Sequence, residues 1–237
     1  MPTVVNAVLL EGMGRALVED VECPRVGLAK LDFTFVAGDP TGEAARSCVE
    51  HATFDLIPCD EQWKELLHAV HGPNLRTHER IAFRSSRFDR EALTQVVKRL
   101  PPEFTIVRVD PSNVDAFSTL GPALVGNFDS TESYLAKGLG FGIWREGRFV
   151  SAVSSFCVAG DELEVEIQTR PEFRRGGLAT ISAAQLILHC LDHGLTPHWD
   201  AHNTMSADLA RKLGFCDELA YETYSCATDS PRQGSAG

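Results

Sequence analysis

Hydrophobic residues recur with the spacing of an amphipathic helix in two segments of the first hundred residues. The first helix is expected to begin after Asp60, because apolar residues there follow an i, i+3, i+4, i+7 order. The second is expected to begin after Asp89 and to stop at the proline pair 101–102, since proline cannot continue a helix. Residues 32–36 favour a strand that ends in a Gly-Asp-Pro turn.

A more regular series of elements is predicted from residue 104 onward. A strand at about 104–109 precedes a helix that Asp110 and Pro111 are expected to open, and the capping-box sequence 129–132 predicts a second helix. Short turns then separate three strands, which indicates an antiparallel meander at about 140–145, 148–158 and 162–169. The series is completed by a helix at 177–193, a strand at 196–201, a helix at 203–213 and a strand at 220–226.

These elements predict a mixed α/β fold in which helices flank a central, mostly antiparallel sheet. Residues 1–103 are expected to form an N-terminal α/β extension whose role the sequence does not decide. Residues 104–226 are expected to form the main domain, and residues 227–237 a frayed tail with nothing to anchor it in a core.

Composition narrows the range of partners and locations. The 237 residues include 43% hydrophobic and 23% charged residues, as in an ordinary globular protein, and no apolar run is long enough to cross a membrane. The seven cysteines are scattered, which predicts reduced thiols in a cytoplasmic protein. The formal charge of −11 argues against nucleic acid as a partner and suits a cationic molecule. Whether the chain forms a homodimer is left open.

The segment 165–180 has the composition of an anion-binding site. It runs from a predicted strand through a loop rich in arginine and glycine directly into a predicted helix. The first amides of a helix lack intrahelical acceptors and lie at the positive end of the helix dipole. Gly176 and Gly177 leave the backbone accessible to a diphosphate, while Arg174 and Arg175 add positive charge. An ordinary exposed turn before a helix remains the alternative.

The sequence Arg174-Arg175-Gly176-Gly177-Leu178-Ala179 resembles the acetyl-CoA motif Gln/Arg-x-x-Gly-x-Gly/Ala of the GNAT superfamily. The predicted order of elements is also similar to the order in that superfamily. Further blocks, among them 137–141, 197–203 and 209–215, resemble one branch, the acetyltransferases similar to the zwittermicin A self-resistance protein. The resemblance covers about residues 60–225 and implies an acetyl-CoA-dependent acetyltransferase, with residues 104–226 as its acetyl-CoA-binding catalytic domain.

The resemblance also implies where acetyl-CoA binds. In GNAT enzymes the strand before the pyrophosphate loop separates from its neighbour and binds the pantetheine arm through its backbone. The matching residues here are Ile167, Gln168 and Thr169. The pyrophosphate is expected at the backbone of the loop and helix start, which comprise Arg174, Arg175, Gly176, Gly177, Leu178, Ala179 and Thr180. Asn203 matches an asparagine that contacts the cofactor, although an asparagine there also suits a helix N-cap.

One departure from the family pattern concerns the general acid. Many GNAT enzymes carry a tyrosine in the last helix that protonates the leaving thiolate, and the matching residue here is Ala210. Solvent or another group could supply that proton, because thiol pKa values lie near 8.5. The only tyrosines are Tyr134, Tyr221 and Tyr224, and the sequence places none of them beside the sulfur.

A general base is required because alkyl ammonium groups are mostly protonated at neutral pH. In the strand 164–169, Glu164, Glu166 and Gln168 alternate with Val165 and Ile167. If the apolar pair faces the core, both glutamates face a substrate. Glu166 is the first candidate for the base and Glu164 the second, against the alternative that they form an ordinary polar strand face.

Other candidate residues carry weaker signals. His189 and His193 stand four residues apart on a helix, but no third ligand is evident, so no metal site is expected. Asp200 and His202 share a strand face and are alternative bases. No serine or cysteine stands in a nucleophile elbow.

The sequence therefore predicts N-acetylation of a small-molecule amine, such as an antibiotic or a metabolite, by direct attack on the thioester. Two alternatives stay open. One is acetylation of a protein or peptide amine, and the other is a GNAT-like domain that binds acyl-CoA as a sensor without catalysis. A fold and a cofactor site alone do not determine the acceptor.

Overall fold

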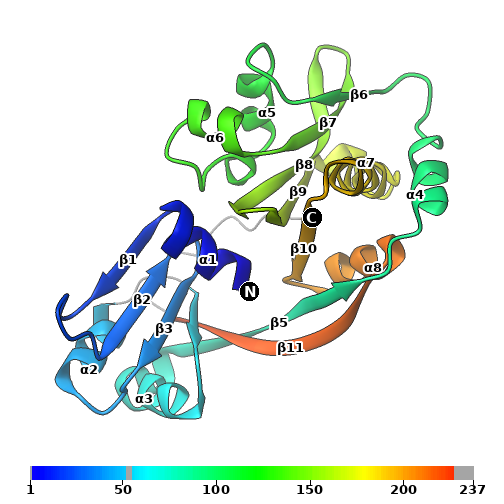
Figure 1. Ribbon diagram of the computed structural model, residues 1–237. Coiled ribbons are helices and arrows are strands. Elements are labelled where there is room, and N and C mark those ends of the chain that lie inside the picture. Colours follow the sequence, from blue (N-terminus) through cyan, green and yellow to red (C-terminus); the bar gives the residue numbers. More distant parts are fainter. Residues whose placement is uncertain (1, 52–54, 227–237) are drawn as a thin grey trace.

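Eleven strands form one continuous sheet in the computed structural model, which describes residues 2–51 and 55–226. Their order is β1-β2-β3-β4-β11-β5-β10-β9-β8-β7-β6, and only the β3/β4 and β9/β10 pairs are parallel. The sheet extends through both halves of the molecule (Figure 1). The strands are β1 (Arg15–Val18), β2 (Val26–Lys30), β3 (Thr34–Gly38), β4 (Leu56–Pro58), β5 (Leu75–Ser86), β6 (Thr105–Arg108), β7 (Gly140–Arg145), β8 (Arg148–Ala159), β9 (Glu162–Thr169), β10 (Thr196–Ala201) and β11 (Phe215–Cys226).

Helices flank this sheet, so the predicted fold class is confirmed. The α-helices are α1 (Pro2–Glu11), α2 (Glu43–His51), α3 (Glu61–His71), α4 (Arg90–Val97), α5 (Val114–Leu120), α6 (Thr131–Lys137), α7 (Leu178–His193) and α8 (Thr204–Leu213). Three short 3-10 helices are η1 (Gly72–Asn74), η2 (Pro122–Leu124) and η3 (Pro171–Phe173). The expected caps are present, because the side chains of Asp60, Asp89 and Ser130 accept hydrogen bonds from the first turns of α3, α4 and α6.

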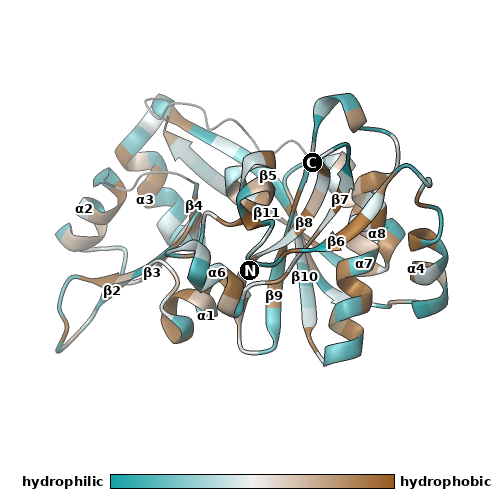
Figure 2. Ribbon diagram, turned by 90° about the horizontal axis from the view of Figure 1, so that it is seen from above, coloured by the Kyte–Doolittle hydropathy of each residue, from teal (hydrophilic) through white to brown (hydrophobic). Residues whose placement is uncertain are grey.

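Two hydrophobic cores lie on opposite faces of the central strands. Helix α7 packs on one face, where Ile167, Ala184, Ile187 and Trp199 are buried together. Brown, hydrophobic residues prevail along this helix in Figure 2, as expected for a helix that lies against a sheet. The opposite face is covered by α1, α5 and η2 around Phe117 and Leu124. Strand β9 is therefore covered on both faces, and side chains on alternate positions enter different environments.

The antiparallel meander is confirmed by the register of β7, β8 and β9. Gly140 pairs with Ser154, and Val153 pairs with Ile167. A bulge between Ser155 and Cys157 shifts the β8/β9 register before Glu164. This irregularity lies beside the part of β9 that carries the candidate glutamates.

The boundary predicted at residue 103 falls inside the continuous sheet. Strand β5 precedes that boundary, yet it lies between β10 and β11, both of which follow it. Its pairing with β11 runs from Phe215↔Ser86 to Cys226↔Leu75. Residues 75–86 are thus part of the central sheet, and the role of the extension is partly to complete it. The predicted tail, residues 227–237, lies outside the described residues.

Two predicted element starts were wrong. Residues 110–112 form a turn in which the Asp110 carboxylate accepts the Ser112 amide at 2.8 Å, so helix α5 begins only at Val114. Strand β11 begins at Phe215, directly after Gly214, and not near residue 220. Before α5 a local side-chain hydrogen bond overrides the sequence pattern, and at the start of β11 the long pairing with β5 does so.

No helix within the described residues is long and apolar enough to span a membrane. All seven cysteines lie in the described ranges, and none of them forms a disulfide with another described cysteine.

Candidate active site

Strands β9 and β10 separate partway along their length. They pair only at Thr196↔Glu162, Pro197↔Leu163 and His198↔Glu164. Beyond this point β10 turns to β5, with Trp199 opposite Phe83 and Ala201 opposite Ile81. The β9 edge from Val165 to Thr169 therefore has no strand partner on the side of β10 within the described residues. Its backbone amides and carbonyls are available to an extended ligand.

The loop after β9 leads into the start of α7 in a conformation that leaves the backbone accessible. Arg175 and Gly177 have φ values of 62° and 78°, and residues 174–177 are exposed. Gly177 caps α7 without a side-chain hydrogen bond, so no side chain satisfies the first amides of the helix. The Arg174 Nε donates to the Thr169 carbonyl oxygen at 3.2 Å, which fixes the loop to the end of β9. The first amides of α7 are thus accessible at the positive end of a helix dipole, which suits a phosphate group.

Asn203 serves as the N-cap of α8. Its Oδ1 accepts the Ser206 amide at 2.8 Å, and its Nδ2 lies 2.9 Å from the His202 Nε2. The capping role expected from the sequence is thus present, while the predicted contact with acetyl-CoA stays a prediction.

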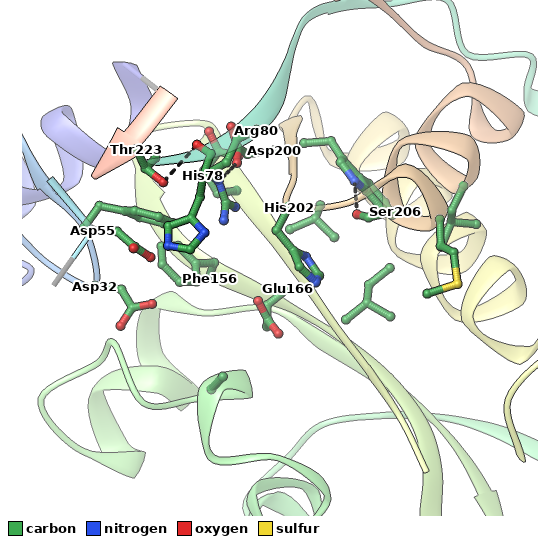
Figure 3. Close-up of a pocket in the computed structure, with 18 of the residues that line it drawn as sticks. Asp32, Asp55, His78, Arg80, Phe156, Glu166, Asp200, His202, Ser206 and Thr223 are labelled. Carbon is green, nitrogen blue, oxygen red and sulfur yellow. Dashed lines mark hydrogen bonds and ion pairs between the residues drawn. The ribbon is translucent and has the colours of Figure 1, made fainter. Parts of the chain in front are cut away.

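A cleft of about 410 Å³ opens where β9 and β10 separate. Its lining comes from β5, β9, β10, α8 and β11, and from segments of the N-terminal region around Asp32 and Asp55. Figure 3 shows Asp32, Asp55 and Glu166 around one hollow, with His78 and His202 nearby. The cleft therefore extends from the β9 edge that lacks a strand partner to the acidic side chains of the N-terminal segments.

The two candidate glutamates both line this cleft, on the strand face opposite the α7 core. Ile167 is buried in that core and Val165 packs against it. Burial, together with the nearby Asp32 carboxylate, raises the pKa of the half-buried Glu166 to about 8. Glu164 is buried, and its pKa is also raised, first by burial and then by the Asp200 charge. A carboxyl group with a pKa near 8 can exchange a proton close to neutral pH.

Gln168 continues this face toward η2. A Cβ on Gly121 would approach the Gln168 Cγ to 2.9 Å, so the glutamine side chain lies against the start of η2. Glycine at 121 therefore provides the space that the Gln168 side chain occupies.

A buried ion pair closes one wall of the cleft. The Arg80 Nε donates to the Asp200 Oδ1 at 2.6 Å, and the Tyr221 hydroxyl donates to the Asp200 Oδ2 at 2.7 Å. The Arg80 guanidinium also lies 4.8 Å from the ring centroid of Phe33. Because both carboxylate oxygens of Asp200 are engaged, this residue is suited to hold Arg80 in place. It is less suited to act as a base.

His202 is the other alternative base from the sequence, and it does lie at the cleft. Burial and the charge of Arg80 lower the pKa of its imidazole, which keeps the ring neutral at pH 7. His198 lies on the paired part of β10 with its Nε2 3.7 Å from the Glu162 carboxylate. His189 and His193 stack on each other on α7 at 3.9 Å between ring centroids.

The hydroxyl groups of all three tyrosines already have partners in the structure. Ala210 is fully buried in the core. The Tyr134 hydroxyl lies 2.9 Å from the Ser154 hydroxyl, and the Tyr224 hydroxyl donates to Glu222 at 2.6 Å. Tyr221 is engaged with Asp200, as described above. Ser206 lines the cleft one turn before Ala210, and its hydroxyl oxygen accepts the Trp199 Nε1 at 3.1 Å.

Sequence reasoning missed the residues that the N-terminal region contributes to the cleft. They are Asp32, Phe33, Asp55, His78, Glu79 and Arg80. Strand β5 gave no usable signal, because its residues 76–80 are all polar and show no apolar alternation. Within the described residues, no group of three histidine, cysteine or acidic side chains could hold a metal ion.

Comparison with known proteins agrees with this architecture. The family model described as GNAT acetyltransferase matches residues 2–224. The chain is 26% identical to the uncharacterised N-acetyltransferase YdfB of Bacillus subtilis, over 94% of this chain and 90% of that protein. A crystal structure of a GCN5-related N-acetyltransferase-like protein from Streptococcus suis is 36% identical, with a TM-score of 0.86 over 95% of this chain and 93% of that one.

A GCN5-related N-acetyltransferase from Kribbella flavida, 15% identical, shares the fold with a TM-score of 0.59 over 93% of this chain and 94% of that one. The residues matched by the family model include the N-terminal strands as well as the meander and α7. The chain therefore belongs to the GNAT acetyltransferase family and is an acetyltransferase.

Proposed function

We propose that this protein transfers the acetyl group of acetyl-CoA to an amine of a small molecule. The observation that carries the proposal is the acidic cleft, which opens at the point where β9 and β10 separate. An amine in the cleft is thereby brought to the edge of the strand on which an acetyl thioester is expected to lie.

The residues fit the chemical groups of acetyl-CoA. The backbone edge of Ile167, Gln168 and Thr169 on the side of β10, which has no strand partner among the described residues, suits the amide-bearing pantetheine arm. The exposed loop and the uncapped start of α7 suit the pyrophosphate, with Arg174 and Arg175 adding charge. Asn203, the N-cap of α8, follows shortly after the end of β10 and is the proposed polar contact to the cofactor. Bound acetyl-CoA supplies an acetyl group activated as a thioester.

Glu166 acts as the general base in the proposed mechanism. It takes a proton from the substrate ammonium, and the neutral nitrogen forms a bond to the acetyl carbon while the carbon–sulfur bond breaks. The nitrogen releases its second proton to solvent as the amide forms. An amide N–H at the unpaired edge of β9, that of Thr169 or its neighbour, stabilises the developing negative charge on the carbonyl oxygen. The CoA sulfur leaves as a thiolate, whose pKa near that of other thiols lets solvent protonate it in the absence of a tyrosine at position 210.

The size of the cleft favours a small molecule over a protein substrate. The N-terminal segments around Phe33 and Asp55 line it together with β9, and its volume of about 410 Å³ suits a small acceptor. The resemblance of several sequence blocks to the branch of the zwittermicin A self-resistance acetyltransferase supports an antibiotic or a metabolite as the acceptor.

Acetyl transfer can be followed by the release of CoA thiol in the presence of candidate acceptors. We expect thiol release with small aliphatic amines and amino sugars, and mass spectrometry should show one added acetyl group on the amine. Peptides with a free N-terminus or a lysine should react at least about 10-fold more slowly, since they do not fit the cleft. Acetylation of the peptides alone would contradict a small-molecule acceptor.

A further inference from the structure

The first turn of α8 places a hydroxyl group on the wall of the cleft. Ser206 belongs to this turn and lines the cleft. Its backbone amide donates to the Asn203 Oδ1 at 2.8 Å, which fixes the serine within the capped turn. In Figure 3, Glu166 and Ser206 lie on either side of His202. The candidate base on β9 and this hydroxyl on α8 therefore stand on different walls of one cleft.

The indole of Trp199 determines how the Ser206 hydroxyl is used. An indole nitrogen can only donate, so the Trp199 Nε1 donates to the Ser206 Oγ at 3.1 Å and the hydroxyl oxygen is the acceptor. Trp199 is only 5% exposed, and its ring packs against Phe215 with 5.3 Å between centroids, which holds the donor in place. The proton of the Ser206 hydroxyl is not used in this contact, so the group can donate it to a ligand in the cleft.

Acetyl transfer creates a new anion in the cleft. When the carbon–sulfur bond breaks, the electron pair stays on sulfur, and a thiolate in a partly buried site requires a hydrogen-bond donor. Of the described residues that line the cleft, Ser206 and Thr223 carry hydroxyl groups, and the Thr223 hydroxyl donates to the His78 carbonyl oxygen at 3.5 Å. Ser206 therefore offers a neutral donor on the side of α8.

The place of Ser206 in the fold fits the direction in which the sulfur leaves. The amine and the sulfur are different substituents of the tetrahedral carbon, so with the amine at Glu166 the sulfur lies toward another wall. Strands β9 and β10 separate after the pair His198↔Glu164, and α8 begins shortly beyond β10. A thioester at the β9 edge thus has Glu166 on one side and the first turn of α8, with Ser206, on another.

We propose that Ser206 is a further catalytic residue, whose hydroxyl donates a hydrogen bond to the CoA sulfur as the carbon–sulfur bond breaks. This inference rests on the proposed function and adds a residue to the same site. The amine nitrogen forms its bond to the acetyl carbon, and the sulfur keeps the electron pair of the broken bond. Ser206 retains its proton, because a hydroxyl group is a much weaker acid than a thiol. The thiolate is then protonated by solvent.

The first test measures the pKa of the thiol of CoA bound to the protein. The ultraviolet absorbance of the thiolate is followed through a pH titration, as the difference between complexes with CoA and with desulfo-CoA, so that the protein's own cysteines cancel. Loss of a hydrogen bond to a charged group should raise this pKa by about one pH unit in Ser206→Ala. Ser206→Thr keeps the hydroxyl group and should restore the natural value. A merely structural role of Ser206 would leave the pKa of the bound thiol unchanged.

The second test measures the rate of acetyl transfer to a small amine in a single turnover. Ser206→Ala should slow the transfer by at least about 10-fold, while its Kd for acetyl-CoA stays within about threefold of the natural value. Ser206→Thr should recover most of the rate. As a matched control, Ser118→Ala removes a hydroxyl group from α5 that donates to the Asp115 carbonyl oxygen outside the cleft, and it should leave the rate unchanged.

Failure of this inference can be told apart from failure of the proposed function. A natural transfer rate and a natural thiol pKa in Ser206→Ala would overturn the role of Ser206 and leave acetyl transfer intact. If no amine is acetylated, the thiol titration still decides the matter, because it requires CoA alone. If Ser206→Ala does not fold, Ser206→Cys provides a second variant, since a thiol accepts from Trp199 but is only a weak donor. Natural protein that binds no CoA would overturn both proposals.

Discussion

Replacing Gly176 by glutamate should weaken acetyl-CoA binding by at least about 100-fold, which corresponds to about 2.7 kcal/mol. Gly176 lies in the exposed loop before α7, where uncapped amides form the proposed pyrophosphate site. A carboxylate there takes the place of the ligand's negative charge and repels the phosphates. Isothermal titration of the purified variant with acetyl-CoA measures the effect.

Gly176 is a better position for the substitution than Gly177, because the backbone at Gly176 can accept a side chain without strain. Gly177 has a φ of 78°, a conformation in which any other residue is strained, whereas a Cβ at Gly176 would make only ordinary contact, 3.5 Å from the Phe173 carbonyl oxygen. Gly176→Ala should therefore bind acetyl-CoA within about threefold of the natural protein, as a matched control. If a folded Gly176→Glu variant binds acetyl-CoA normally, the pyrophosphate site must lie elsewhere.

Replacing Glu166 by glutamine should lower kcat/KM for amine acetylation by about 100-fold or more, the usual contribution of a general base. The amide has the shape of the carboxyl group but cannot accept the substrate proton. Binding of acetyl-CoA should be unchanged, since Glu166 faces the cleft and not the loop before α7. Steady-state kinetics with a small amine and titration with acetyl-CoA separate the two effects.

The pH dependence of kcat/KM provides a second test of the role of Glu166. A base must be deprotonated, and the pKa of Glu166 is raised to about 8 by burial and by Asp32. In the natural protein kcat/KM should therefore rise with pH up to about 8, and the part of this rise due to Glu166 should be absent in Glu166→Gln. The corresponding Glu164→Gln variant tests the other glutamate. A greater loss of kcat there than in Glu166→Gln would assign the base to Glu164.

The stability of Glu166→Gln provides a check on the same pKa. A carboxyl group whose pKa is raised in the folded state favours folding while protonated, and this contribution is lost as pH rises toward the folded pKa near 8. Glutamine cannot ionise, so the variant should melt at a higher temperature than the natural protein at pH 8.5. At pH 4 the two melting temperatures should agree. Equal melting temperatures at both pH values would mean that Glu166 is not desolvated.

The part of the fold that the sequence predicted best is the part with strong local signals. Two-residue turns separate the strands of the meander from β7 to β9, β9 alternates apolar and polar residues, and α7 has a continuous apolar surface that ends at Gly194. These features depend on neighbours in the sequence. The face of β9 that carries Glu164 and Glu166 was predicted from the same alternation.

The wall of the cleft opposite β9 was beyond sequence reasoning. Strand β5 is polar over residues 76–80, and it is held by pairing with β11, which lies more than a hundred residues away in the sequence. The approach of Asp32 and Asp55 to Glu166 likewise depends on how the N-terminal strands continue the sheet through β4 and β11. Such long-range pairings leave no mark in a local pattern. The buried pair of Arg80 with Asp200 could not be anticipated for the same reason.

The most direct test of the central claim is isothermal titration of the natural protein with acetyl-CoA, with NAD as the control. Both ligands carry a pyrophosphate, but only acetyl-CoA has a pantetheine arm for the unpaired edge of β9. We predict saturable binding of acetyl-CoA at one site per chain and much weaker binding of NAD. Well-folded protein that binds neither ligand, or binds both equally, would contradict an acetyl-CoA site between β9 and β10.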